Sequence, residues 1–210
     1  MAISKNDIIK VNGIIIGTND VKEIDKLIEI LTDELGRIKA FAFSSKSQKS
    51  TKLASTRLFT TGVFELVKNN EIYSILSIDV KNYYEELVND YDNYCLATKF
   101  IKQIKDVTYE NMDCHNELSL LCYSLSAILS KNIKNEVVEK VFEIKLSEIS
   151  GINEPSEIIV NKHNLKNPGN IKALIDNIYN VDVPNLFKFN LEGDLYEDFM
   201  KIKINLKNNI

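Results

Sequence analysis

The chain has 210 residues, 44% of them hydrophobic, and a formal net charge of −4. A chain of this size and composition can bury a sizeable core, which excludes general disorder, and its overall charge excludes a uniformly basic nucleic-acid binder. The longest apolar runs, such as Ile14–Ile16, are far shorter than the roughly 20 residues of a membrane helix, and residues 1–7 show no secretory signal. We therefore expect a cytoplasmic protein without membrane contact.

Short runs of β-branched and aromatic residues predict strands in the first part of the chain. These runs are Ile8–Ile16, Arg37–Phe43, Ser55–Val67 and Ile72–Asp79. The segment Val21–Glu34 fits a helical face as well as a strand, and we expect a strand because a helix would remove one strand from the sheet. About five strands in ~80 residues favour a small closed barrel of the OB type.

From Tyr83 onward apolar residues recur about every 3.6 positions, which predicts helices that continue to a stop at Gly151. Residues 151–170 are polar and contain two of the three prolines. This segment is predicted to be an irregular connection, with a short hairpin as an alternative.

Further helices are expected over residues 170–179 and 194–205. The predicted fold class is therefore α+β, with an amino-terminal OB-fold β-barrel in residues 1–80 and an all-helical domain in residues 81–210. The connection at 151–170 lies within the helical domain.

The stretch Leu35–Phe64 is the only long segment that is basic and contains no acidic residue. Its cations are Arg37, Lys39, Lys46, Lys49, Lys52 and Arg57. In the predicted strand, Lys39, Phe41 and Phe43 share the face opposite to Ile38, Ala40 and Ala42. Cations beside exposed aromatic rings are what sequence-tolerant binding of single strands requires, because they neutralise phosphates and stack on bases. The alternative is that both rings pack against the helical body and the lysines only solubilise a loop.

The three cysteines, Cys95, Cys114 and Cys122, are an odd number without CxxC spacing, so reduced and mostly buried thiols are expected. A metal site or a Cys/His catalytic pair at Cys114 and His115 would need further ligands or facing side chains, and buried cysteines beside a surface histidine explain the pattern more simply. No phosphate loop, nucleophile elbow or zinc-protease motif occurs. We expect no enzyme activity, no cofactor and no metal.

The segment from Leu31 to Leu66 resembles the RecO family of bacterial recombination mediators. Five residues match the family's turn L-T-x-E-x-G-[KR], namely Leu31, Thr32, Glu34, Gly36 and Arg37. Five more match its P-F-x-x-G-x-F-E-L segment, namely Phe59, Gly62, Phe64, Glu65 and Leu66. The similarity continues through Tyr83 and Tyr84, the helix Val141–Pro155 and the closing segment Leu186–Ile202, so that it covers nearly the whole chain.

The resemblance implies a DNA repair and recombination protein of the bacterial cytoplasm, associated with the nucleoid. Such a protein binds and anneals single-stranded DNA, and works with RecR to load RecA onto strands that single-strand binding protein covers. It implies a nucleic-acid site at Arg37, Lys39, Phe41, Lys46, Lys49, Lys52 and Arg57. A stripe of Lys99, Lys102 and Lys105 is the expected contact for the acidic carboxy-terminal tail of single-strand binding protein.

The chain departs from the family pattern in two places. Phe43 and Ser44 stand where the family usually has Lys-Gly, and Lys46 and Ser47 stand where it has an arginine pair, so weaker phosphate contact is expected. Many members also have four zinc-binding cysteines after the G-x-x-P turn, and this chain has no cysteine beyond Cys122. Two alternatives stay open: an adaptor that acts mainly through RecR or single-strand binding protein, and an RNA-binding OB module.

Overall fold

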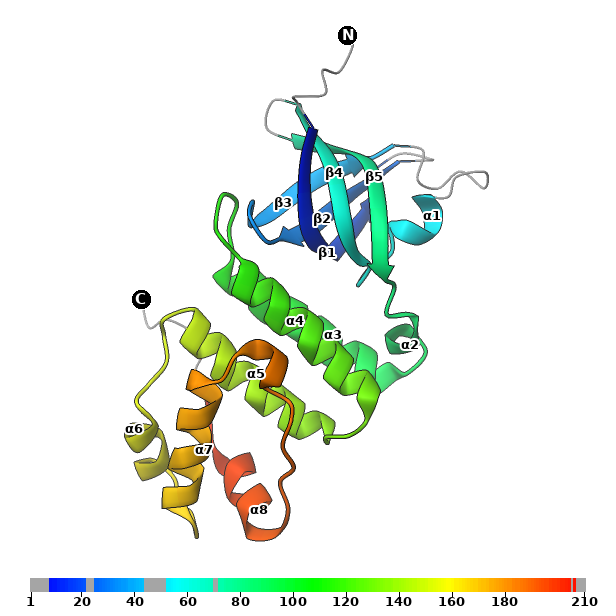
Figure 1. Cartoon of the computed structure of the whole chain (residues 1–210). Coiled ribbons are helices and arrows are strands. Elements are labelled where there is room, and N and C mark those ends of the chain that lie inside the picture. The colour runs from blue at the N-terminus through cyan, green and yellow to red at the C-terminus, as the bar shows by residue number, and fades with distance from the viewer. Residues whose placement is uncertain (1–7, 22–24, 44–51, 70–71, 205, 207–210) are drawn as a thin grey trace. The chain divides into compact units, whose positions relative to one another are not determined.

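The computed structural model describes residues 8–21, 25–43, 52–69, 72–204 and 206. These residues fold into two compact units, coloured along the chain in Figure 1. The first unit holds the chain up to Glu85 together with Lys105–Leu118, and the second holds Glu86–Ile104 together with the residues from Ser119 onward. The predicted division between residues 80 and 81 stays a prediction.

The first unit is built on five strands. These are β1 (Ile8–Asp20), β2 (Lys26–Thr32), β3 (Arg37–Ala42), β4 (Thr61–Asn69) and β5 (Ile72–Asn82). They close into a barrel in the order β1-β2-β3-β5-β4, in which every pairing is antiparallel except the short parallel one between β3 and β5. This confirms the OB-type barrel, and β2 confirms the strand expected within residues 21–34.

Alternation along the strands places the core inside the barrel. In β3, Ile38, Ala40 and Ala42 are almost completely buried, while Lys39 is exposed and Phe41 is half-buried on the other face. Ile28, Ile30, Phe64 and Leu66 are among the residues that pack with them. The inward and outward faces of β3 are therefore as the alternation predicted.

The strand predicted over Ser55–Val67 begins later than expected. Its first residue, Ser55, ends the short helix α1 (Lys52–Ser55), residues 56–60 form a turn, and Phe59 takes a φ of 69°, which an extended strand cannot accommodate. The strand therefore starts at Thr61, after the buried Phe59 ring.

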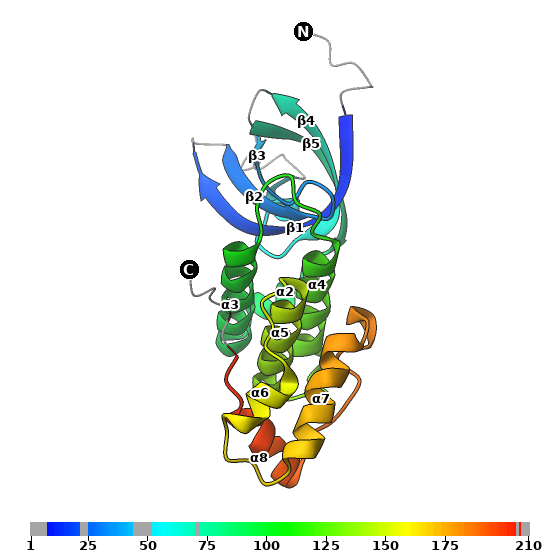
Figure 2. The ribbon, with the colours of Figure 1, turned by 90° about the vertical axis from the view of Figure 1, so that its left-hand side faces the viewer.

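Helices form the second unit, and parts of some of them belong to the first. They are α2 (Glu85–Val88), α3 (Tyr91–Val107), α4 (His115–Ser130), α5 (Asn135–Ile149), α6 (Ser156–Asn161), α7 (Pro168–Asn180), the 3₁₀ turn η2 (Val183–Asn185) and α8 (Gly193–Lys201). Figure 2 shows α5, α7 and α8 packed together, and the rings of Phe100 and Phe142 stack with centroids 4.0 Å apart. Within the described residues, no helix has both the length and the hydrophobicity to cross a bilayer.

Two details of the helical part correct the sequence-based expectations. The hairpin considered for residues 151–170 is wrong, because α6 forms there and buries Ile159 and Val160; six residues are too few for a helical period to be recognised. The last helix ends at Lys201, not at 205, since Ile202 already has extended backbone angles.

The three cysteines are free, as expected, but Cys95 is exposed, whereas Cys114 is buried and Cys122 is half-buried. The expectation of mostly buried thiols is therefore wrong for Cys95.

Candidate nucleic-acid interface

The turn between β2 and β3 is held against the segment that follows α3. Gly36 has a φ of 69°, and a Cβ atom there would collide with the carbonyl oxygen of Tyr109, so only glycine fits. The main-chain amides of Arg37 and Asn111 donate to the carbonyls of Tyr109 and Leu35, at 2.9 and 2.8 Å. These bonds place the segment 109–111 beside the start of β3, all within the first unit.

A groove of about 650 Å³ lies between this segment and the barrel, and we call it the β3 groove. It is lined by Glu29, Arg37, Lys39, Lys68, Ile72, Tyr109, Glu110 and Asn111. Three of these side chains are cationic, two are carboxylates, and Tyr109 is 63% exposed. The groove thus offers charges for an anion and one accessible ring for stacking.

Arg37 is fixed in place inside the groove. Its Nη1 donates to Glu29 Oε1 at 2.9 Å and its Nε donates to the carbonyl of Thr108 at 3.1 Å. Lys105 Nζ donates to the other carboxylate oxygen of Glu29 at 2.5 Å. Burial favours the neutral acid, but the hydrogen bonds from Lys105 and Arg37 outweigh it and hold the pKa of Glu29 below its ordinary value.

Lys39 is the cation of the groove whose charge no described carboxylate uses. It lies opposite Glu29 in the pairing of β2 with β3, is exposed, and forms no ion pair with any residue that the structure describes. Lys68 is more engaged, because its Nζ lies 5.1 Å from the ring centroid of Tyr73 and 3.9 Å from Glu110 Oε1. Lys39 is therefore the side chain best placed to meet a phosphate.

Two phenylalanines continue the same outward face. The rings of Phe41 and Phe43 stack with centroids 5.7 Å apart and an interplanar angle of 20°, and Phe43 is 48% exposed. Phe43 is therefore not buried, and its packing against the helical body stays untested. Rings presented in this way can stack on nucleic-acid bases, at roughly 1–3 kcal/mol for each stacked base.

The structure brings together only part of the predicted nucleic-acid site. Arg37, Lys39 and Phe41 share one face of β3. Lys46 and Lys49 lie outside the described residues, and of Lys52 only the backbone, at the start of α1, is described. Arg57 is exposed and its Nη1 lies 3.5 Å from Glu85 Oε1, and it does not line the β3 groove.

The predicted lysine stripe on α3 does not form a row of available cations. Lys99 contacts Glu139 and donates to Glu143 at 2.9 Å; burial lowers the pKa of Lys99, but these two contacts outweigh it and raise the value overall. Lys105 is bound to Glu29. Lys102 is exposed and has no ion pair among the described residues.

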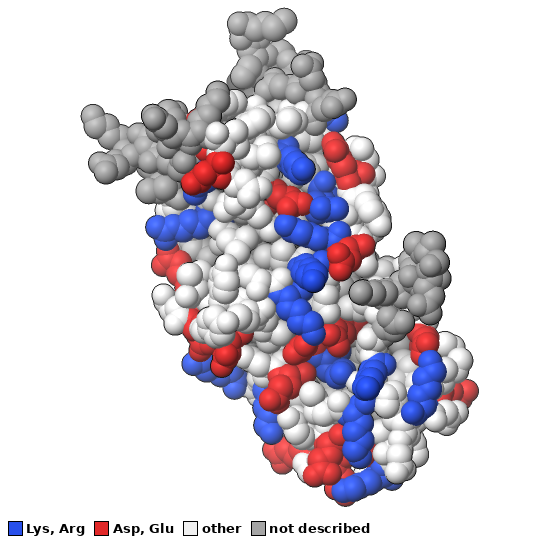
Figure 3. Space-filling model, turned by 180° about the vertical axis from the view of Figure 1, so that it is seen from behind, with Lys and Arg blue, Asp and Glu red and all other residues white. Residues whose placement is uncertain are grey.

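Sequence reasoning missed Glu29, Lys68 and Tyr109. Tyr109 comes from the loop between α3 and α4, and nothing in its neighbourhood in the sequence connects it with β3. In the upper part of Figure 3, red Asp and Glu side chains lie among the blue Lys and Arg side chains. Across the described residues, no three His, Cys, Asp or Glu side chains gather in a way that could hold a metal ion.

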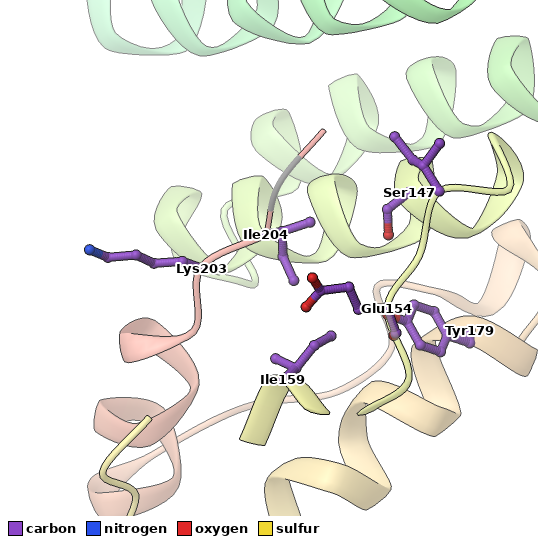
Figure 4. A pocket seen from close by; sticks show the side chains of 7 residues that line it. Ser147, Glu154, Ile159, Tyr179, Lys203 and Ile204 are labelled. Carbon is purple, nitrogen blue, oxygen red and sulfur yellow. The ribbon is translucent and has the colours of Figure 1, made fainter. Parts of the chain in front are cut away.

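The helical unit has a second hollow, shown in Figure 4. Ile204 points into it towards Glu154 and Ile159, and the Tyr179 hydroxyl donates to the carbonyl of Glu154 at 2.9 Å. Its volume is about 10 Å³, which is about the space of one water molecule. This excludes it as a site for a base or a peptide side chain.

Comparison with known proteins gives a family match over the barrel. Residues 6–84 match the family model described as "Recombination protein O N terminal". The chain is 30% identical over 145 residues to the DNA repair protein RecO of Clostridium kluyveri, covering 69% of this chain and 56% of the relative. It is 31% identical over 144 residues to that of Acetivibrio thermocellus, covering 68% and 57%. The chain thus spans a little over half the length of these curated relatives.

Proposed function

Because the chain belongs to the RecO family of DNA repair and recombination proteins, we propose that it binds single-stranded DNA along the outer face of β3 and the β3 groove. Bound strands would then be annealed or handed to other recombination proteins. The proposal concerns stoichiometric binding and involves no hydrolysis of nucleotides.

The observation that carries this proposal is the combination on β3 of an available cation with accessible rings. Lys39 is exposed and unpaired within the described part of the chain, and Phe43, which directly follows β3 and stacks on Phe41, is 48% exposed. A single strand presents phosphates and unpaired bases together, so it can use both features, whereas a duplex hides its bases. Neither feature reads base edges, which suits binding of any sequence.

The same contacts support annealing. Two complementary strands repel each other through their phosphates, and cations that neutralise part of this charge lower the barrier to their encounter. Bases that stack on Phe41 and Phe43 remain unpaired, with their hydrogen-bonding edges free for a second strand.

The family relationship also supports protein partners. We propose that the chain works with RecR and with the carboxy-terminal tail of single-strand binding protein, so that RecA can be loaded onto the exposed strand. Of the three α3 lysines considered for the acidic tail, Lys102 is the one whose charge is not used by a described carboxylate.

The proposal is tested by fluorescence anisotropy of a labelled strand of about 30 nucleotides, which exceeds the roughly 4–16 nucleotides that one OB fold covers. The wild type is compared with Lys39→Ala, with Phe43→Ala, and with Lys46, Lys49 and Lys52 changed together to Ala. Lys10→Ala is the matched control, because Lys10 is also a barrel lysine but pairs with Glu65 at 2.6 Å and does not line the groove.

We expect salt-sensitive binding by the wild type and by Lys10→Ala, and weaker binding by Lys39→Ala, by Phe43→Ala and by the triple variant. Absence of wild-type binding at every salt concentration would support the adaptor alternative instead. Competition with RNA of the same sequence tests the third possibility, since recognition of 2′-hydroxyl groups would favour RNA.

A further inference from the structure

The carboxylate of Glu29, in the first unit, lies between two cations, Arg37 and Lys105, and binds both. One carboxylate oxygen accepts from Arg37 Nη1 at 2.9 Å and the other accepts from Lys105 Nζ at 2.5 Å. The Glu29 side chain is 19% exposed, against 28% for Arg37 and 29% for Lys105. Both charged oxygens of the carboxylate are therefore in use, and all three groups still reach solvent.

Neighbouring residues leave space for this ion pair and orient it. Gly17 lies opposite Glu29 in the pairing of β1 with β2, and a Cβ atom there would lie 3.0 Å from Glu29 Oε2 and 3.2 Å from Lys105 Nζ. The absence of a side chain at Gly17 thus makes room for the lysine. The Arg37 guanidinium is oriented by its second bond, to the carbonyl of Thr108.

A backbone phosphate can satisfy the same two donors. Like a carboxylate, it presents two charged oxygens in one plane, which a guanidinium and an ammonium group can bind together. Glu29 and Arg37 both line the β3 groove, and Lys39, the register neighbour of Glu29, lies exposed beside them. A strand that reaches Lys39 therefore brings its phosphates close to the position of the Glu29 carboxylate.

We propose that Arg37 and Lys105 form a phosphate-binding position for single-stranded nucleic acid, and that Glu29 occupies this position as an internal competitor when no strand is bound. This inference rests on the proposed function. It assigns Lys105 to the nucleic-acid groove, in place of the partner-protein stripe in which the sequence pattern had put it. It also makes Glu29 a residue that limits affinity, so that a bound strand can be released.

The first test is Glu29→Gln, which keeps the shape of the side chain and removes its charge. Glu65→Gln is the matched control, because it changes the net charge of the barrel equally and also breaks an ion pair, that with Lys10, outside the groove. We expect Glu29→Gln to bind the labelled strand roughly three- to tenfold more tightly, as removal of one nearby like charge predicts. The slope of log affinity against log salt should become steeper by about 0.7 for each additional phosphate that the protein neutralises. Glu65→Gln should change affinity less than about twofold, because its charge lies outside the groove.

The second test places Lys105→Ala in the wild type and in Glu29→Gln. If Lys105 meets a phosphate once Glu29 is neutral, the loss of affinity on removing Lys105 is larger in the Glu29→Gln background. Equal losses in both backgrounds, or unchanged affinity in Glu29→Gln, would overturn the inference while wild-type binding still upheld the proposed function. Absence of strand binding by the wild type would overturn both this inference and the proposed function.

A measurement on the wild type covers the case in which Glu29→Gln does not fold. The side-chain Nε resonance of Arg37 is followed by NMR while an unlabelled strand is added. Displacement of Glu29 by a phosphate should shift this resonance in step with binding. A resonance that stays unchanged while the Phe43 signals shift would show that the strand passes by without entering the Arg37–Lys105 position.

Discussion

Lys39 of the barrel unit and Lys145 of the helical unit have opposite roles. In the barrel unit, Lys39 projects from β3 into solvent without a described ion pair. In the helical unit, Lys145 is only 6% exposed and donates to the carbonyl of Tyr179 at 2.8 Å, and Lys140 donates to the carbonyl of Ile202 at 2.6 Å. Lys166 likewise contacts Asp194 and Glu197. The number of cations in a segment therefore says little about binding of nucleic acid. A cation is available for a phosphate only if no carboxylate or carbonyl of the chain already binds it.

The largest effect is expected on folding stability, when a lysine whose charge is bound within the fold is replaced. Replacement of Lys145 by Ala removes the donor to the Tyr179 carbonyl and the partner of Glu148, which lies 2.9 Å away. The free energy of unfolding should fall by about 3 kcal/mol, as is typical when one partner of a buried polar contact is lost. Urea denaturation of this variant and of Lys102→Ala, an exposed lysine of the same unit, measures the difference. If Lys102→Ala lowered the free energy of unfolding by the same amount, the proposed difference between bound and exposed lysines would be wrong.

Phe43→Ala should have the next largest effect, on binding and not on stability. Loss of a stacking surface worth roughly 1–3 kcal/mol lowers affinity for a single strand about five- to 150-fold. A strand of the same length without bases is the control ligand, because it keeps the phosphates and offers nothing to stack. If Phe43→Ala weakens binding of both ligands equally, the ring does not act by stacking.

Lys39→Ala should have a smaller effect, visible chiefly in the salt dependence. Loss of one phosphate contact reduces the slope of log affinity against log salt by about 0.7. The free energy of unfolding should stay within about 0.5 kcal/mol of the wild type, since the side chain is exposed. An unchanged slope would mean that Lys39 does not meet a phosphate.

The last prediction is a change of stability with pH, and it concerns a carboxylate of the helical unit whose contribution shrinks in acid. Burial raises the pKa of Asp198, but bonds from Lys201 and from the main-chain amide of Asn167 outweigh it and lower the pKa to about 2, against an ordinary value of 3.8. This stabilisation is complete above the unfolded value and is lost as pH falls towards 2. The stability gap between wild type and Asp198→Asn should therefore narrow between about pH 5 and pH 2, as thermal unfolding can measure.

The features that the sequence predicted correctly depend only on residues close together in the chain. Alternation in Arg37–Ala42 indicated which side chains of β3 face outward, and the motif around Gly36 pointed to the turn. The sequence could not show that Arg37 is bound by Glu29, or that Lys105, 76 residues from Glu29, completes the pair, because such contacts exist only after the barrel closes. The helix α6 was missed for a different reason, since it is shorter than two turns.

The main-chain bonds that join the β2–β3 turn to the segment 109–114 have an evolutionary consequence. The amides of Arg37, Asn111 and Cys114 donate to the carbonyls of Tyr109, Leu35 and Asp33, and none of these bonds involves a side chain. Substitutions along the groove can therefore accumulate without reshaping its wall. The side chains of the groove can thus set how firmly a strand is held while the backbone scaffold stays the same.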